Sequence, residues 1–221
     1  FRVVSSDAFA PAKLKTMRAF GADLLLVPSQ GGQITPDLVP RMMEKAREIA
    51  QADDVYFTNQ FHNADMLAGY EQLAHELLEQ AGHPPDAFVA SFGTAGMVVG
   101  VARVLRRSSP QTRIVILEPA TSAVVSTGVA GTHHIEGIGV GFVPPLLEPT
   151  DYDEARGIEE AEARAMARRL AAEEGIFAGV STGANVTGAL QLARELGAGC
   201  TVVTVAVDTG LKYLTGDLYA D

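Results

Sequence analysis

The sequence predicts an α/β fold with a mainly parallel sheet that is covered by helices on both faces. Short apolar runs alternate with segments of helical periodicity along the 221 residues, an order that is typical of parallel strands joined by crossover helices. Several runs, such as residues 24–27 and 114–117, are apolar without alternation, as expected for strands buried on both faces. Two glycine-containing turns follow apolar runs, so we expect both at the carboxyl ends of strands, where such sheets bind ligands.

The elements divide into two groups along the chain. In the first group we expect strands at residues 2–5, 23–27 and 55–57 and helices at 10–20 and 35–50, with Gly21 ending the first helix and Thr35 and Pro36 beginning the second. In the second group we expect helices at 65–80, 97–107, 159–174 and 184–196 and strands at 86–91, 113–117 and 201–206. The pattern divides near Asn59. We therefore predict part of a small α/β lobe at residues 1–59 and a larger lobe at residues 60–221.

Composition narrows the class of protein. The formal net charge is −10 and no large basic cluster is present, so nucleic acid is not an expected partner. No apolar run approaches the ~20 residues that span a bilayer. A single cysteine, Cys200, excludes an internal disulfide, and we expect it to be buried. These properties suit a cytoplasmic enzyme.

The first turn comprises residues 91–97, Ser-Phe-Gly-Thr-Ala-Gly-Met. A strand that ends in such a turn and enters a helix presents free backbone N–H groups, and the helix dipole favours an anion there. Thr94 adds a hydroxyl. One interpretation is therefore a phosphate site, and the alternative is a tight strand–helix turn without a ligand. The turn is not a nucleoside-triphosphate loop, because no Gly-Lys-Ser/Thr follows it.

The second turn comprises residues 179–184, Gly-Val-Ser-Thr-Gly-Ala. Ser181 could simply cap the helix that we expect from Ala184. Alternatively, its hydroxyl is a neutral hydrogen-bond partner for a pyridine nitrogen. An aspartate at this place would keep that nitrogen protonated, whereas a serine need not. A weaker electron-withdrawing ring suits elimination at Cβ.

The ordered set of motifs resembles the pyridoxal-phosphate enzymes of the cysteine synthase and cystathionine β-synthase family. The resemblance runs from about Leu14 to the end of the chain. It includes Asn59-Gln60-Phe61-His62-Asn63, Ser91-Phe92-Gly93-Thr94-Ala95-Gly96, His134-Ile135-Glu136-Gly137-Ile138-Gly139, Gly179-Val180-Ser181-Thr182-Gly183 and Val207-Asp208-Thr209-Gly210. It implies fold-type II, with a large lobe and part of a smaller one.

The resemblance also implies site residues and a reaction. The cofactor phosphate would lie at Gly93, Thr94, Ala95, Gly96 and Met97, and the pyridine nitrogen at Ser181, with Asp208 and Thr209 beside it. Gln60 would approach the substrate carboxylate, and Gly137 and Gly139 would line the mouth of the site. The reaction is β-replacement on an activated serine, O-acetylserine or O-phosphoserine, by sulfide or another nucleophile. Family members are usually homodimers.

The sequence departs from the family pattern in three places. Ala95 and Met97 replace a glycine and a threonine of the phosphate loop, and the methyl of Ala95 is tolerable if φ is negative there. Residues 71–77 replace a Thr-Thr-Gly-Pro-Glu-Ile stretch, which leaves the acyl group and nucleophile open. None of Lys13, Lys15, Lys45 and Lys212 stands in the context of the Schiff-base lysine. We expect that lysine upstream of Phe1, so this chain alone should be inactive.

Other functions remain open at this point. Cystathionine β-synthase-like, diaminopropionate-type and serine or threonine dehydratase-like activities share the same chemistry. A protein of another class, a catalytically inactive ligand-binding or interaction module, would lack the Schiff-base lysine altogether. The adjacent pair His133 and His134 does not predict a metal site, because neighbouring side chains in an extended segment point to opposite sides.

Overall fold

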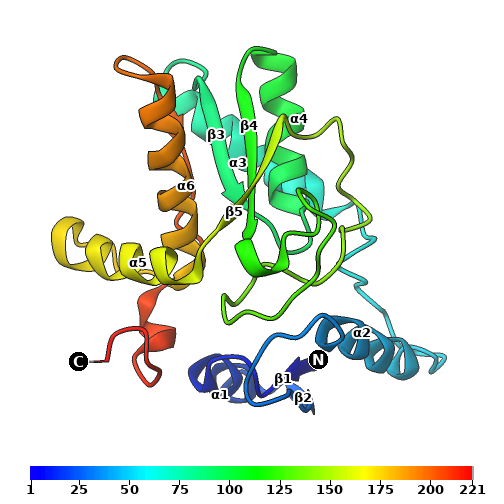
Figure 1. Cartoon of the computed structure of the whole chain (residues 1–221). Helices are drawn as coiled ribbons and strands as arrows, with labels where there is room; N and C mark the ends of the chain where they lie inside the picture. Colours follow the sequence, from blue (N-terminus) through cyan, green and yellow to red (C-terminus); the bar gives the residue numbers. More distant parts are fainter. Residues whose placement is uncertain (221) are drawn as a thin grey trace.

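Two parallel sheets organise the chain (Figure 1), and the computed structural model describes residues 1–220. The first sheet pairs β1 (Arg2–Ser6) with β2 (Asp23–Val27), and α1 (Pro11–Ala19) connects them. The helix α2 (Leu38–Ile49) follows and contacts both strands. The second sheet has the order β5-β4-β3-β6 and consists of β3 (Ala87–Ser91), β4 (Arg113–Pro119), β5 (Glu154–Ile158) and β6 (Val202–Val203). The two sheets lie on either side of Asn59 in the sequence.

Helices cover both faces of the four-stranded sheet, as the sequence predicts. The helices α3 (Met66–Ala81) and α4 (Gly96–Ser108) lie on one face, and α5 (Glu160–Glu174) and α6 (Val180–Leu196) lie on the other (Figure 1). The side chains of β3 alternate between these layers. Phe88 and Ala90 pack in the cluster beneath α3 and α4, whereas Ala87 and Val89 pack beneath α5 and α6. The α/β fold with a parallel sheet is therefore confirmed.

The prediction of a strand at residues 55–57 is wrong. No strand forms there, and the side chains of Val55 and Tyr56 are 41% and 79% exposed. An apolar triplet becomes a strand only when a neighbouring strand can pair with it, and neither sheet extends to this segment.

The opposite error concerns β5, which the sequence did not predict. It pairs in parallel with β4 at the edge of the sheet, and its Glu154 and Arg156 form an ion pair with each other. Half-exposed edge strands lack the continuous apolar run that marks a buried strand. Two smaller expectations also fail, because β6 has only two residues and Cys200 is exposed.

Two short 3₁₀ helices, η1 (Ala120–Ser122) and η2 (Gly210–Tyr213), lie in the loops near the carboxyl ends of the strands. Within residues 1–220, no helix is both long enough and apolar enough to cross a membrane.

Candidate active site

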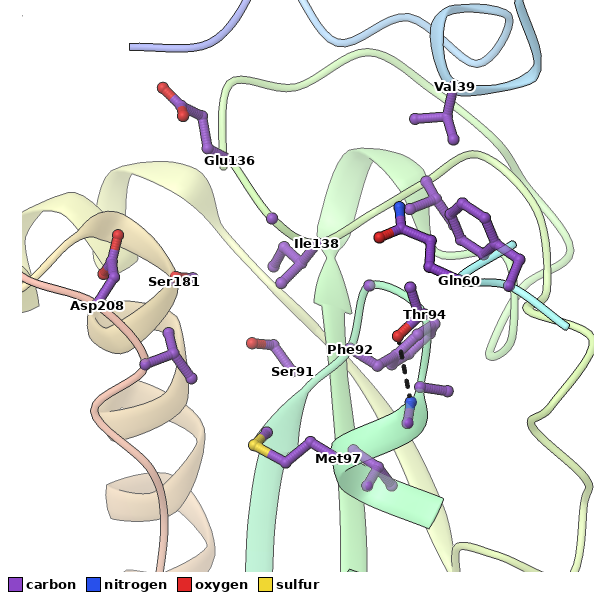
Figure 2. A pocket seen from close by; sticks show the side chains of 18 of the residues that line it. Val39, Gln60, Ser91, Phe92, Thr94, Met97, Glu136, Ile138, Ser181 and Asp208 are labelled. Atoms are coloured by element: carbon purple, nitrogen blue, oxygen red, sulfur yellow. Dashed lines mark hydrogen bonds between the residues drawn. The ribbon is translucent and has the colours of Figure 1, made fainter. Parts of the chain in front are cut away.

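A cavity of about 490 Å³ lies at the carboxyl end of β3 (Figure 2). The first part of the chain contributes Phe9, Lys13, Ile34, Val39 and Met42 to its wall. The larger part contributes both glycine turns and the loop at residues 136–140. Its volume falls within the range of small-molecule sites, and the end of a parallel strand is where such folds place them.

The first turn leads directly from β3 into α4. The strand ends at Ser91 and the helix begins at Gly96, so the N–H groups of the first helical turn have no intrahelical partner. Thr94 lies beside them, and its Oγ1 accepts a hydrogen bond from the N–H of Gly96 at 3.4 Å. Together with the helix dipole, these donors make the turn suited to an anion.

Ala95 adopts a conformation that the sequence did not predict. Its φ is +66°, in the left-handed region, so the condition under which its methyl group would be tolerable, a negative φ, is not met. Left-handed residues at a helix start redirect successive backbone N–H groups into one concave site. The turn therefore keeps the geometry of a glycine while carrying an alanine, at a conformational cost of about 1–2 kcal/mol.

The second turn lies in the same cavity wall. The helix α6 begins at Val180, four residues before the expected start, so Ser181 stands in its first turn and is 4% exposed. The side chain of Asn185 fixes this end of the helix: its Oδ1 accepts from the N–H of Ser91 at 2.7 Å, and its Nδ2 donates to the carbonyl of Val205 at 2.8 Å. The two turns, about ninety residues apart in sequence, are thus tied together at one site.

A polar network surrounds Asp208 beside the second turn. Its carboxylate accepts from the N–H of Gly179 at 3.0 Å and from the hydroxyl of Tyr213 at 2.5 Å. The ammonium of Lys13 donates to Tyr213 and to Glu136, both at 2.8 Å. Burial, together with the hydrogen bond to Asp208, raises the pKa of Tyr213 above its ordinary value. Tyr213 therefore remains a neutral donor that joins α1 to the cavity wall.

Most of the predicted site residues meet in this cavity. Gly93, Thr94, Ala95, Gly96, Met97, Ser181, Asp208, Gln60 and Gly137 all line it. Figure 2 shows Ser181 and Asp208 on one side and Gln60 and Thr94 on the other, with Ser91 and Ile138 between them. A flat molecule held at both ends could therefore occupy the space between the first and second turns.

Two predicted residues lie elsewhere. Thr209 is exposed and outside the cavity lining, and its hydroxyl accepts from the N–H of Leu211 at the start of η2. Gly139 is buried behind the wall, where its carbonyl lies 2.7 Å from Nε2 of His133.

Sequence reasoning missed Lys13 and Glu136 as residues of the cavity wall. Lys13 and Glu136 face each other across 123 positions of the chain, and a pairing at that separation leaves no periodic signal. The one available signal for Glu136 was its place directly before Gly137 in the predicted mouth.

The fold and the cavity define a class of protein. A parallel sheet that presents backbone donors at a helix start, with a buried hydroxyl across the same cavity, suits a cofactor with a phosphate at one end and a heteroaromatic nitrogen at the other. The residues present therefore fit a pyridoxal-phosphate enzyme.

Comparisons with known proteins agree with this class. Residues 1–208 match the family model described as pyridoxal-phosphate dependent enzyme. A cysteine synthase from Staphylococcus aureus (strain Mu50 / ATCC 700699) is 38% identical over 216 residues, which are 97% of this chain and 68% of that protein.

Two solved structures are similar throughout the chain. An O-ureido-L-serine-bound mutant of O-ureido-L-serine synthase superposes with a TM-score of 0.90 at 36% identity, covering 99% of this chain and 67% of that one. An O-acetylserine dependent cystathionine β-synthase from Helicobacter pylori gives a TM-score of 0.89 at 30% identity, covering 99% and 78%.

The chain belongs to the cysteine synthase family of fold-type II pyridoxal-phosphate-dependent enzymes. Its cofactor is pyridoxal phosphate, its substrates are small amino acids, and its reaction class is β-replacement on a serine derivative.

Proposed function

We propose that this protein is a cysteine synthase-like enzyme that replaces the Cβ substituent of O-acetylserine or O-phosphoserine with sulfide or a related nucleophile. The observation that carries the proposal is the meeting of the first turn, Ser181 and Gln60 in one cavity. Bound pyridoxal phosphate supplies the electron-withdrawing ring that makes removal of the Cα proton possible.

The first turn holds the phosphate in this proposal. Residues Gly93 to Met97 lead into the start of α4 and line the cavity, so their N–H groups would hold the phosphate, and Thr94 would add its hydroxyl. Met97 has no hydroxyl, so the phosphate has one donor fewer than a threonine at that position would give. Loss of one hydrogen bond to a charged acceptor costs about 1.5–3 kcal/mol before water takes its place.

Ser181 contacts the ring nitrogen in this proposal. A hydroxyl can hydrogen-bond the nitrogen without transferring a proton, and burial at 4% exposure shields that bond from water. Asp208 then acts on the ring nitrogen only indirectly, because its carboxylate accepts a hydrogen bond from the N–H of Gly179 at the start of the second turn.

Gln60 and the apolar wall complete the substrate side. Gln60 carries an amide that can donate to a carboxylate, and Phe92 and Ile138, 3% and 5% exposed, exclude water from the cavity. This arrangement binds an amino acid beside the cofactor and leaves its Cβ substituent free to depart.

The test measures product formation by the full-length protein loaded with pyridoxal phosphate. O-acetylserine and O-phosphoserine are each offered with sulfide, homocysteine and ammonia. We expect cysteine to form fastest, and Ser181→Ala to lower kcat/KM about tenfold through loss of one buried hydrogen bond. Ser126→Ala, on an exposed loop, is the matched control and should leave the rate unchanged.

Other results would redirect or reject the proposal. Faster product formation with homocysteine or ammonia identifies the cystathionine or diaminopropionate alternative. Pyruvate formation without a nucleophile identifies a dehydratase. If the protein binds pyridoxal phosphate but turns over none of these pairs, the β-replacement proposal is wrong.

Assembly and location are further parts of the proposal. Homodimer formation and a cytoplasmic location rest on the family resemblance and on the acidic composition. Sedimentation of the purified protein and fractionation of cells test them. The role of Thr209 at the cofactor and the Schiff-base lysine remain predictions of the resemblance.

A further inference from the structure

The imidazole of His133 is buried at 2% exposure and makes two hydrogen bonds of opposite direction. Nε2 lies 2.7 Å from the carbonyl oxygen of Gly139, and Nδ1 lies 3.2 Å from the backbone nitrogen of Ile135. A carbonyl can only accept and an amide N–H can only donate, so the ring carries its proton on Nε2 and is neutral. One tautomer therefore satisfies both contacts.

These bonds hold the loop that forms part of the cavity wall. Gly139 has a φ of +66°, and a Cβ there would lie 2.4 Å from Nε2 of His133, so the loop packs against the ring without spare room. Two residues earlier, the carbonyl oxygen of Gly137 would lie 2.5 Å from a Cβ at Gly93. Close packing thus links His133, through this wall, to Gly93 in the first turn.

The backbone of His133 is anchored on the opposite side. Its carbonyl accepts from the N–H of Ile34 at 3.1 Å, and its own N–H donates to the carbonyl of Ile34 at 3.3 Å. Ile34 is 4% exposed and lines the cavity. One residue therefore joins the wall that comes from residues 1–59 to the wall that comes from the larger part of the chain.

We propose that His133 is a positioning residue for the β-replacement site: its imidazole fixes the loop at residues 135–139, and this loop holds the first turn and its cofactor in place. The inference rests on the proposed function for its activity readout. It assigns His133 no contact with substrate or cofactor. The residue acts through Gly139 and Gly137.

Two substitutions separate the two bonds of the ring. His133→Gln places an amide N–H near the position of Nε2 and can keep the bond to Gly139. His133→Asn places its amide near Nδ1 and can keep the bond from Ile135 but not the one to Gly139. If the Gly139 bond positions the wall, the cofactor-site affinity of the Gln variant should stay within about threefold of that of the parent protein. The affinity of the Asn variant should be about tenfold weaker.

Three measurements read out this difference. The first is the dissociation constant of pyridoxine 5′-phosphate with the cofactor-free protein, by calorimetry. The second is the split between KM for the serine substrate and kcat, since a misplaced wall should raise KM more than it lowers kcat. The third is hydrogen exchange of residues 135–139 in the cofactor-free protein, which should speed up in the Asn variant.

His134→Asn is the matched control. Its ring is half-exposed, and its Nδ1 lies 3.4 Å from Glu160 rather than against the wall. It should leave all three measurements unchanged.

The outcomes distinguish this inference from the proposed function. Equal behaviour of the Gln and Asn variants, with parent-like binding, KM and exchange, would show that His133 only fills space and would overturn the inference. If the parent protein binds cofactor but performs no β-replacement, the proposed function fails, while binding and exchange still test His133. If the Asn variant does not fold, the comparison of the Gln variant with the parent protein decides: loss of binding in a folded Gln variant overturns the role of the Gly139 bond.

Discussion

The first and second turns look alike in sequence but do different work in the structure. Most of the first turn precedes α4, and Ala95, the residue directly before that helix, is left-handed, so the turn presents backbone N–H groups. The second turn lies inside α6 almost from its start, and it presents the side chain of Ser181. The difference teaches that a glycine before a helix shapes a backbone site, whereas a glycine within a helix allows close packing.

The glycines of the two turns are approached by different parts of the molecule. A Cβ at Gly183 would lie 1.9 Å from the carbonyl oxygen of Ala163 in α5, whereas a Cβ at Gly93 would meet the carbonyl of Gly137 in the cavity wall. The second turn is therefore fixed by the core, and the first turn is fixed by the site.

The largest effect is expected from Gly183→Ala. The new methyl group cannot fit against the backbone of α5, so the two helices must separate, at a cost of about 3 kcal/mol or more in the free energy of unfolding. Urea unfolding measures this loss. Gly69→Ala on α3, where the structure leaves open space, is the control and should not destabilise. An equal, small effect of both substitutions would break the comparison.

Gly93→Ala should act on the cofactor more than on the fold. Its methyl group would push on the carbonyl of Gly137 and shift either the wall or the first turn. We expect a tenfold to hundredfold weaker affinity for pyridoxal phosphate, which corresponds to about 1.4–2.7 kcal/mol. Titration of the cofactor-free protein measures it. If the free energy of unfolding falls as much as it does in Gly183→Ala, while the affinity for pyridoxal phosphate is unchanged, the first turn serves packing rather than cofactor binding.

Ala95→Gly should stabilise the protein. A left-handed alanine destabilises the folded state by about 1–2 kcal/mol, and glycine removes this strain. Glycine also gives the unfolded chain more conformational freedom, which offsets part of the stabilisation, so the net gain in the free energy of unfolding is about 0.5–1 kcal/mol. Ala68→Gly, on the exposed side of α3, should instead destabilise by a similar amount. Thermal unfolding of both variants decides the sign. A loss of stability in Ala95→Gly would mean that the methyl group contributes packing that outweighs the strain.

The sequence could predict the parts of this molecule whose signal is local. Apolar runs predict the buried strands β3 and β4, and glycines between a strand and a helix predict the first turn. Which residues line the cavity was harder to predict, because this depends on contacts between segments that are distant in the sequence. Gly139 was expected in the mouth and lies behind it, held by His133, which no local pattern marks as special.

The conformation of Ala95 shows a different limit. Its φ follows from how β3 and α4 must meet, and an alanine gives no hint of a left-handed residue.

The exposure of a side chain is also a property of the assembled fold. Cys200 was expected inside on the average behaviour of cysteines, but it lies outside because the strand β6 starts two residues later and is short.

The last expected effect is a pH dependence that acts on the side of the first turn alone. Burial lowers the pKa of His133 below its ordinary value of 6.5; the hydrogen bond to Gly139 and the charge of Glu160 oppose this, and His134 adds to it. A second proton would have to sit on Nδ1, where the N–H of Ile135 already points.

As the pH falls below ~6.5, the imidazole of His133 therefore becomes protonated in the unfolded chain but stays neutral in the folded protein. The free energy of unfolding decreases until the pH reaches the pKa that His133 has in the folded protein. The slope from this one residue is at most about 1.4 kcal/mol per pH unit. Urea unfolding of the parent protein and of His133→Gln at about pH 7.5 and about pH 5.5 measures it, with a smaller decrease expected in the variant. Because α5 and α6 hold the second turn without His133, the acid-induced change in hydrogen exchange should appear at residues 135–139 and not at residues 180–185. Parallel decreases in the two proteins would show that other groups carry the acid sensitivity. Equal changes in exchange at the two segments would show that the two turns respond to pH alike.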